Sequence, residues 1–283
     1  MLKYIVSLLA AFSLVACFKI KEATTLYPDG SGKMEFTFAM KKSMAALMSA
    51  GGEDPFEEFR DPDKLEEGFA GFVAWSKGRV SEEGAWKSYQ MTGYFEDINA
   101  VRMLNDDMET GETEQMMGFE LTKDEEGNHV LLVDNDMYRS LREDIGGEDE
   151  SGEEAGDAEL DGMQEMMEAM LEGMELEFSF TLPADILEAE GFLETEGRTA
   201  SMKVTDEMLL HDDKPEIAEK MAKLDAAERG KIVWMGSAVT DEQMKAFEAE
   251  LEAAKVEWKR IAAEYRAAKE KEAAEEGAGD QEE

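Results

Sequence analysis

The feature that most constrains the fold is a strict alternation of apolar and polar residues in several short segments. Residues 175–182 place four apolar residues between four polar ones, and Pro183 follows. Residues 34–40 repeat this period. Because the side chains of a strand point alternately to its two faces, a period of two predicts strands with one buried and one solvated face. The sequence therefore predicts antiparallel sheet.

Two β-hairpins are predicted. Residues 18–26 alternate with Glu22 interrupting the apolar face, and residues 27–32 contain the Pro, Asp and Gly that turns require, so this segment pairs with the strand that follows. Residues 116–121 and 130–133 form the second hairpin. Both hairpins connect strands that are neighbours in sequence.

Helical spacing predicts helices at residues 41–49, 98–104 and 215–227. Another helix begins at Asp61-Pro62-Asp63, and its apolar stripe consists of Leu65, Phe69, Phe72 and Val73. Strands and helices that alternate without a parallel pattern indicate an α+β fold, with antiparallel hairpins, packed helices and a long C-terminal amphipathic helix.

That last helix is predicted over residues 239–275, with Thr240 as its N-cap and Gln243, three residues later, completing a capping box. Its apolar positions are spaced alternately by three and four: Met244, Phe247, Leu251, Ala254, Trp258, Ile261, Tyr265 and Ala268. Such a heptad seam has two interpretations. The helix packs on its own domain, or Met244, Phe247, Leu251, Trp258, Ile261 and Tyr265 bind a protein partner or a second copy.

The charge excludes one class of partner. The chain carries 68 acidic and 29 basic residues, a formal net charge of −39, and its acidic surface repels nucleic acid and also anionic lipid headgroups. Residues 143–161 are acidic and glycine-rich, which predicts a disordered loop within a domain spanning residues 17–238. Residues 276–283 are predicted to be a disordered acidic tail.

The N-terminus carries an export signal. Lys3 precedes an apolar run over residues 5–16, which is shorter than the roughly 20 residues that span a bilayer. The run ends in Leu14-Val15-Ala16-Cys17, which resembles the lipobox of bacterial lipoproteins. The resemblance implies that residues 1–16 are removed and that Cys17 is acylated. An ordinary signal peptide with an incidental cysteine, and an uncleaved N-terminal helix, are the alternatives.

The lipoprotein interpretation also explains why the chain has a single cysteine, since acylation consumes the thiol. It places the exported protein at the cell membrane by its lipid. In Gram-negative lipoproteins an Asp after the cysteine signals retention in the inner membrane. Here Phe18 follows, which implies the outer membrane, facing the periplasm, if the organism has one.

Two motifs of the mature region resemble LppM-type bacterial lipoproteins. They are Leu26-Tyr27-Pro28-Asp29-Gly30-Ser31-Gly32 and Phe178-Ser179-Phe180-Thr181-Leu182-Pro183. The resemblance implies a sandwich-like α+β domain that contacts lipid or glycolipid. Ala184 and Glu190 stand where the family often has Gly and Asn, and the resemblance assigns no functional residue.

No catalytic residue, metal site or cofactor is predicted. The two histidines, His129 and His211, lie in polar surroundings and are interpreted as surface residues. No serine stands in a Gly-x-Ser-x-Gly motif. Asp61-Pro62-Asp63 and Asp134-Asn135-Asp136 begin like calcium loops but lack the Gly and the Glu that complete one.

A methionine-rich segment leaves three interpretations open. Its members, Met163, Met166, Met167, Met170 and Met174, lie on one face of a helix. This face is part of the core, an adaptable groove for a lipid or partner, or a set of soft ligands for Cu(I).

Together these patterns predict a membrane-anchored lipoprotein of the cell envelope with a non-enzymatic binding or assembly role. The alternative is a carrier or sensor of a lipid or another hydrophobic ligand. An envelope hydrolase is the third and least supported hypothesis.

Overall fold

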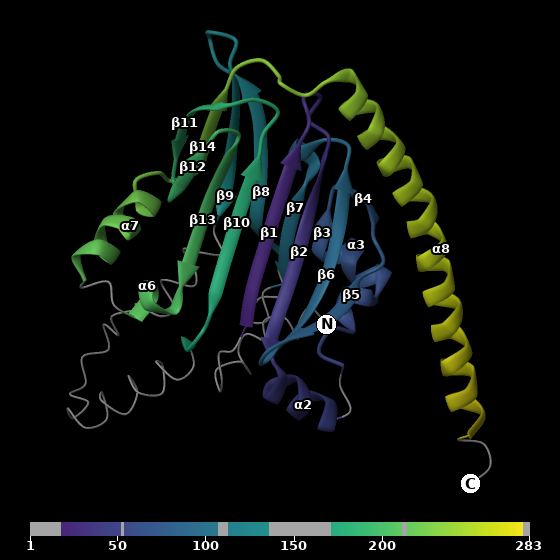
Figure 1. The fold of residues 1–283 in the computed structure, drawn as a ribbon. Helices are drawn as coiled ribbons and strands as arrows, with labels where there is room; N and C mark the ends of the chain where they lie inside the picture. Colours follow the sequence, from purple (N-terminus) through teal and green to yellow (C-terminus); the bar gives the residue numbers. More distant parts are fainter. Residues whose placement is uncertain (1–17, 52–53, 107–112, 136–170, 211–213, 280–283) are drawn as a thin grey trace, which may run out of the picture.

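The computed structural model describes residues 18–51, 54–106, 113–135, 171–210 and 214–279. They form two sheets, several short helices and one long C-terminal helix (Figure 1). The predicted α+β class is confirmed. The signal sequence with Cys17, the acidic segment 143–161, His211 and residues 163–170 of the methionine-rich segment lie outside the described residues.

The larger sheet contains eight strands in the order β12-β13-β10-β1-β2-β6-β4, with β5 paired to β6. The strands are β1 (Phe18–Leu26), β2 (Gly32–Lys41), β4 (Phe72–Trp75), β5 (Arg79–Glu83), β6 (Trp86–Phe95), β10 (Glu175–Thr181), β12 (Glu194–Glu196) and β13 (Thr199–Thr205). The hairpin of β1 and β2 is confirmed, with Leu26 opposite Gly32.

One pairing in this sheet joins distant parts of the sequence. Strand β1 lies parallel to β10, so that Lys19 pairs with Glu175 and Glu22 pairs with Phe178. A parallel pair needs a long connection, and the sequence between the two strands supplies one. Strand β1 is therefore a central strand, with β2 on one side and β10 on the other.

The second sheet has the order β11-β14-β9-β8-β7-β3. Its strands are β3 (Phe69–Ala70), β7 (Arg102–Asp106), β8 (Thr113–Lys123), β9 (His129–Asn135), β11 (Ile186–Glu190) and β14 (Gly230–Trp234). The predicted hairpin near residues 116–133 is confirmed as β8 and β9.

The two sheets bury their apolar faces against each other. Strands β7, β8 and β9 lie behind β1 and β10 in Figure 1. The rings of Phe119 on β8 and Phe180 on β10 are 6.1 Å apart, edge to face, across this interface. Phe178, Leu131 and Met34 are also buried there. The alternating strands thus place their apolar residues in one core, as the period of two predicts.

The helices are α2 (Lys42–Ala50), η2 (Glu58–Arg60), α3 (Pro62–Gly68), η3 (Ile98–Ala100), α6 (Asp206–Leu210), α7 (Pro215–Asp225) and α8 (Asp241–Gly279). Among the described residues, none of these helices is both long and apolar enough to cross a bilayer. Helix α8 runs along the β4 side of the molecule (Figure 1).

The prediction of one helix carrying Leu65, Phe69, Phe72 and Val73 is wrong. Helix α3 ends at Gly68, and the rest of the stripe lies in strands β3 and β4. Gly71 between them has a φ of +84°, and a Cβ there would stand 2.3 Å from the Ala100 carbonyl oxygen. Only glycine accommodates this turn, and the turn directs the chain from one sheet to the other.

Two further boundaries differ from the prediction. The segment 98–104 makes one turn, η3, and then joins the second sheet as β7, because pairing with β8 outweighs its helical spacing. Helix α8 ends at Gly279, beyond the predicted residue 275. Gly277 does not end it, since an internal glycine costs a helix only about 1 kcal/mol relative to alanine.

Candidate functional site

The predicted seam of α8 is covered by the same chain over most of its length. Phe247, Leu251 and Trp258 are buried, and Met244, Ile261 and Tyr265 are half-buried. The ring of Phe247 stacks on Tyr27 with the centroids 4.0 Å apart. The interpretation in which this helix packs on its own domain is therefore the one that the structure displays. A partner at Phe247 would have to displace α8 from that domain.

Polar contacts also fix α8 beside the larger sheet. Glu250 accepts hydrogen bonds from Lys33 at 2.9 Å and from the Tyr94 hydroxyl at 3.0 Å. Burial raises the pKa of Tyr94, and the carboxylate of Glu250 raises it further. One turn later, the Lys255 ammonium lies 2.6 Å from Glu96.

The C-terminal part of α8 is held by helix α3. Lys269 donates to Asp61 at 2.7 Å, and Arg266 donates to Asp63 at 2.8 Å. Asp61 also accepts from the backbone N–H of Asp63, which makes it the N-cap of α3. Burial alone would raise the pKa of Asp61, but the hydrogen bonds from Lys269 and the Asp63 backbone, together with the charge of Lys269, outweigh burial and lower the pKa. The Asp61-Pro62-Asp63 motif thus provides the N-cap of α3 and the ion-pair partners of Lys269 and Arg266 on α8.

A cleft with a volume of about 350 Å³ lies between α8 and strands β3 and β4. Its walls consist of Glu66, Phe69, Phe72, Val73, Trp75, Trp258, Lys259, Ala262, Ala263 and Arg266. The small side chains of Ala262 and Ala263 on α8 lie across from three aromatic residues of β3 and β4, Phe69, Phe72 and Trp75. The aromatic floor therefore results from the strands that replaced the predicted helical stripe.

The aromatic residues of the cleft belong to a packed cluster. The rings of Phe72 and Trp75 are 4.6 Å apart, and those of Phe69 and Trp75 are 5.2 Å apart. Trp75 is fully buried, whereas Phe69 and Phe72 are half-buried and Val73 is exposed. Because neighbouring rings hold each other in place, the floor of the cleft is preorganised for an apolar group.

Charged groups lie at the rim of this cleft. Arg266 already pairs with Asp63 and lies 3.5 Å from Glu66. Lys259, about two turns earlier in α8, is exposed. The arrangement offers apolar contact on the rings and charged groups of both signs at the edge, with Lys259 and Arg266 cationic and Glu66 acidic. It suits an amphipathic molecule with an anionic group.

The space between the two sheets is much smaller than the cleft beside α8. A cavity lined by Phe178, Phe180, Phe192 and Met202, among others, has a volume of about 30 Å³. Such a volume holds about one or two water molecules and no acyl chain. The cleft beside α8 is therefore the larger of these two spaces.

One carboxyl group is buried in the sandwich. Glu22 is 3% exposed and accepts a hydrogen bond from the Thr24 hydroxyl at 3.2 Å. Burial raises its pKa to about 7, and the Thr24 hydrogen bond opposes this shift. Its pairing with Phe36 and Phe178 on the two neighbouring strands explains the burial. The interrupted alternation of residues 18–26 was the sequence signal for this group.

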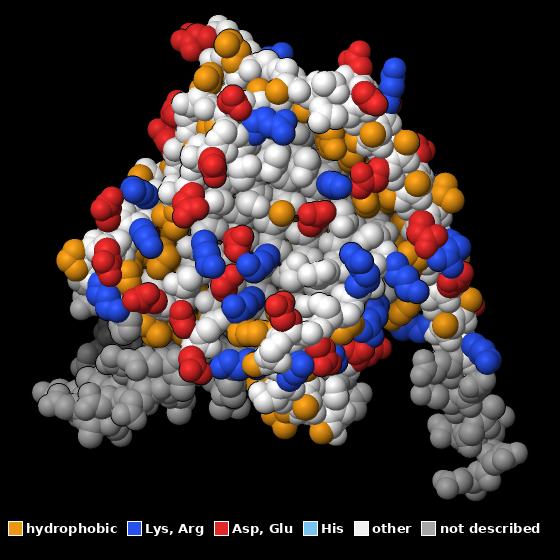
Figure 2. Space-filling model, viewed as in Figure 1, with side chains coloured by type: hydrophobic (Ala, Val, Ile, Leu, Met, Phe, Trp, Pro, Cys, Tyr) orange, Lys and Arg blue, Asp and Glu red, His pale blue; other side chains and the backbone are white. Residues whose placement is uncertain are grey.

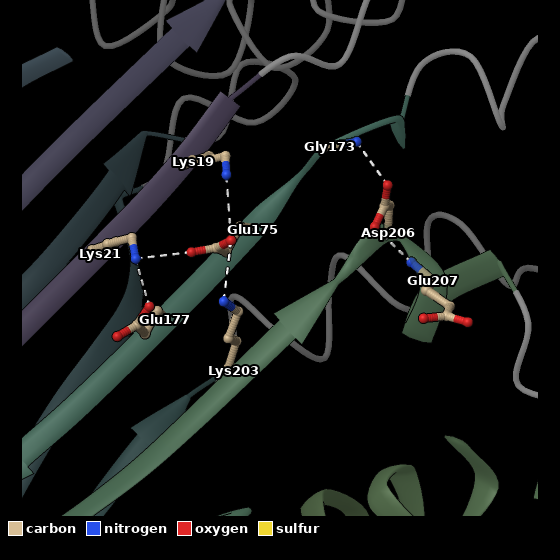
Figure 3. Close-up of polar contacts among 8 residues, drawn as sticks. All are labelled: Lys19, Lys21, Gly173, Glu175, Glu177, Lys203, Asp206 and Glu207. Atoms are coloured by element: carbon tan, nitrogen blue, oxygen red, sulfur yellow. Dashed lines mark hydrogen bonds and ion pairs between the residues drawn. The ribbon is translucent and has the colours of Figure 1, made fainter. Parts of the chain in front are cut away.

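The outer face of the same sheet carries an ion-pair cluster. Figure 3 shows the Glu175 carboxylate between Lys19, Lys21 and Lys203, at 3.4, 2.9 and 3.2 Å. Lys21 also contacts Glu177 at 2.8 Å. Burial alone would raise the pKa of Glu175, but hydrogen bonds from Lys21 and Lys203 outweigh it and lower the pKa to about 2. The cluster links β1, β10 and β13 across the sheet.

The structure places the remaining sequence candidates apart from one another. His129 is half-buried and stacks on Trp234 at 5.3 Å. Asp134 pairs with Arg229, and Met174 is buried in the core. Among the described residues, no group of three or more His, Cys, Asp or Glu side chains could hold a metal ion.

No protein-family model and no curated protein matches the chain. Among solved structures, the NMR structure of the folded domain of the Mycobacterium tuberculosis LppM protein is similar, with a TM-score of 0.32 and 8% sequence identity. The similarity covers 81% of this chain and 94% of that chain. A TM-score this low shows neither a common fold nor a common function, so the role of this chain rests on its own residues.

Proposed function

We propose that the protein is a cell-envelope lipoprotein, held at the membrane by acylated Cys17, and that it binds an amphipathic ligand in the cleft beside α8 without changing it chemically. The observation that carries the binding role is this cleft of about 350 Å³ with an aromatic floor. Its volume lies at the lower end of the range of ligand pockets, roughly 300–1,000 Å³.

The chemistry of the cleft defines the ligand class. The rings of Phe69 and Phe72 contact an apolar group, and Lys259 attracts a negative group at the rim. Lys259 thus supplies a cationic group beside an apolar surface, on a chain whose net charge is −39. A lipid headgroup with the first part of its acyl chain and a free amphipathic anion share this chemistry.

The anchor is supported by the sequence and by the position of β1. Cys17 immediately precedes Phe18, the first residue of a central strand. Each buried CH₂ contributes about 0.8 kcal/mol, so several acyl chains on one residue hold a protein at a bilayer stably.

The binding role is tested with the anionic, aromatic fluorophore anilinonaphthalene sulfonate and the mature chain. The Ala263→Trp substitution fills the cleft without removing a core side chain. We expect it to weaken binding of the fluorophore by about tenfold, the equivalent of about 1.4 kcal/mol. Val256→Trp is the matched control, because Val256 is 71% exposed on the same helix and does not line the cleft. Equal binding by A263W and the unsubstituted chain would refute the cleft as the site.

The anchor is tested separately with the full chain in a bacterial host. The Cys17→Ser substitution removes the acceptor of the lipid, so we expect the protein to move from the membrane fraction to the soluble fraction. Mass spectrometry of the mature N-terminus of the unsubstituted protein should find an acylated cysteine. Membrane fractionation that C17S leaves unchanged would contradict lipid anchoring and leave the cleft as a separate question.

A further inference from the structure

One end of the larger sheet brings together the start of the mature chain and helix α2. Phe18 pairs with Met40, and α2 begins two residues later at Lys42. The backbone N–H of Lys42 donates to the Ala85 carbonyl at 2.8 Å, which ties α2 to the turn between β5 and β6. The residue predicted to carry lipid, Cys17, directly precedes this end of the sheet.

Helix α2 is unlike the rest of the surface. In a chain of which 34% is charged, residues 43–52 contain no charged side chain. Leu47 is 67% exposed, Met44 and Met48 are half-buried, and Ala45 is buried. Figure 2 shows the lobe of α2 at the lower end of the molecule, with hydrophobic side chains at its tip. The helix thus projects from the end of the sheet and presents apolar groups to the outside.

The base of α2 has the residues that are typical of a membrane interface. Lys41 pairs with Glu172 at 3.0 Å and Lys42 pairs with Glu82 at 2.9 Å, so the charges here are balanced. Trp86 on β6 pairs with Lys41 on β2. The centroid of its ring lies 4.7 Å from the Lys19 ammonium. Tryptophan and lysine are favoured at the level of lipid headgroups, where an apolar body and a polar tip are both satisfied.

We propose that this end of the molecule is its lipid-contacting surface, an inference that rests on the proposed anchoring through Cys17. Helix α2 lies in the headgroup region of the leaflet that holds the acyl chains, with Leu47 directed into it and Trp86 at its boundary. The lipid on Cys17 supplies the affinity, and α2 sets the orientation of the domain on the bilayer.

A lipid surface fits this helix better than a protein partner does. Nine residues give a helix about 14 Å long, at 1.5 Å per residue. Such a helix covers much less than the roughly 800 Å² that each partner buries in a stable protein interface. A helix that adds to an existing lipid anchor does not need that area.

The inference is tested with the lipidated full-length protein in vesicles of equal parts phosphatidylethanolamine and phosphatidylglycerol. Leu47→Cys and, as the matched control, Met235→Cys are labelled with a thiol-reactive, environment-sensitive fluorophore. Met235 is 66% exposed and directly follows β14, from which the chain leaves at the end of the domain away from α2 (Figure 1). Acylation blocks the Cys17 thiol, so that only the introduced cysteine reacts.

We expect the label at position 47 to lose about half of its emission when lipids with a shallow nitroxide are added, since interfacial helices enter the bilayer by about 5–10 Å. The label at position 235 should be unaffected. An unquenched label at position 47 on acylated, vesicle-bound protein overturns the inference and leaves the anchor intact. A blue shift without quenching also overturns the inference, because it means that protein rather than lipid covers the label at position 47. Protein without acyl chains refutes the anchor and the inference together.

Discussion

The two faces of the larger sheet shift the pKa of a glutamate in opposite directions. Glu22 and Glu175 lie on the neighbouring parallel strands β1 and β10. Glu22 points into the core and burial raises its pKa to about 7. Glu175 points outward, where three lysines surround it and its pKa is about 2. The difference between them comes from the face alone, because a strand alternates its side chains between a dry and a wet side.

This contrast shows how so acidic a chain maintains a core. Negative charge is tolerated on the outer face, where lysines and water stabilise it. On the inner face a carboxylate has neither, so the neutral form is favoured. The two proposed binding surfaces, the cleft and α2, differ from both faces because each exposes apolar groups to the outside.

The largest effect is expected from an inner-face truncation. Phe178→Ala should destabilise the domain by about 3–5 kcal/mol, because it leaves a cavity beside a side chain that is 2% exposed. Chemical denaturation of the mature chain measures the change. Ser179→Ala, one residue along β10 on the other face, is the control and should cost less than about 1 kcal/mol. Similar costs for the two variants would show that the faces are not distinct.

The next effect is a pH dependence that Glu22 imposes. Its pKa rises from an ordinary 4.5 to about 7 on folding, so the folded state binds the extra proton and stability is lost as pH rises through this window. Glu22→Gln is uncharged at every pH. We expect the variant to gain about 3 kcal/mol over the unsubstituted chain between pH 4.5 and pH 8, at 1.36 kcal/mol for each pKa unit. A stability difference that stays constant with pH would place Glu22 in contact with solvent.

The smallest effect is expected on the outer face. Glu175→Gln should cost about 1 kcal/mol at pH 7, a value reduced by the water and salt that screen the cluster. Because folding lowers the pKa of Glu175, this stabilisation is present above pH 4.5 and is lost as pH falls toward 2. Denaturation at low and high salt checks both points. A cost that salt does not reduce would mean that the cluster is not electrostatic in origin.

Much of the fold followed from periodicity. The alternation in residues 175–182 predicted a strand with Phe178 and Phe180 inside, and both are buried. The seam of α8 was predicted residue by residue through Tyr265. The cleft was not predicted, because Phe69 and Phe72 have helical spacing with Leu65 and the short strands β3 and β4 form only through partners that are distant in sequence. Lipidation of Cys17 stays a prediction from sequence.

The sequence by itself determined the class of fold, the buried face of the strands and the covered face of α8, because these depend on spacings of a few residues. Tertiary structure decided which strands became neighbours, and so it alone brought β1 beside β10, gathered Lys19, Lys21 and Lys203 around Glu175, and opened the cleft between α8 and β4. The same pairing sets Phe18 beside Met40 and places α2 next to the proposed anchor. Contacts between distant segments leave no local period in a sequence, and for that reason only the folded chain displays them.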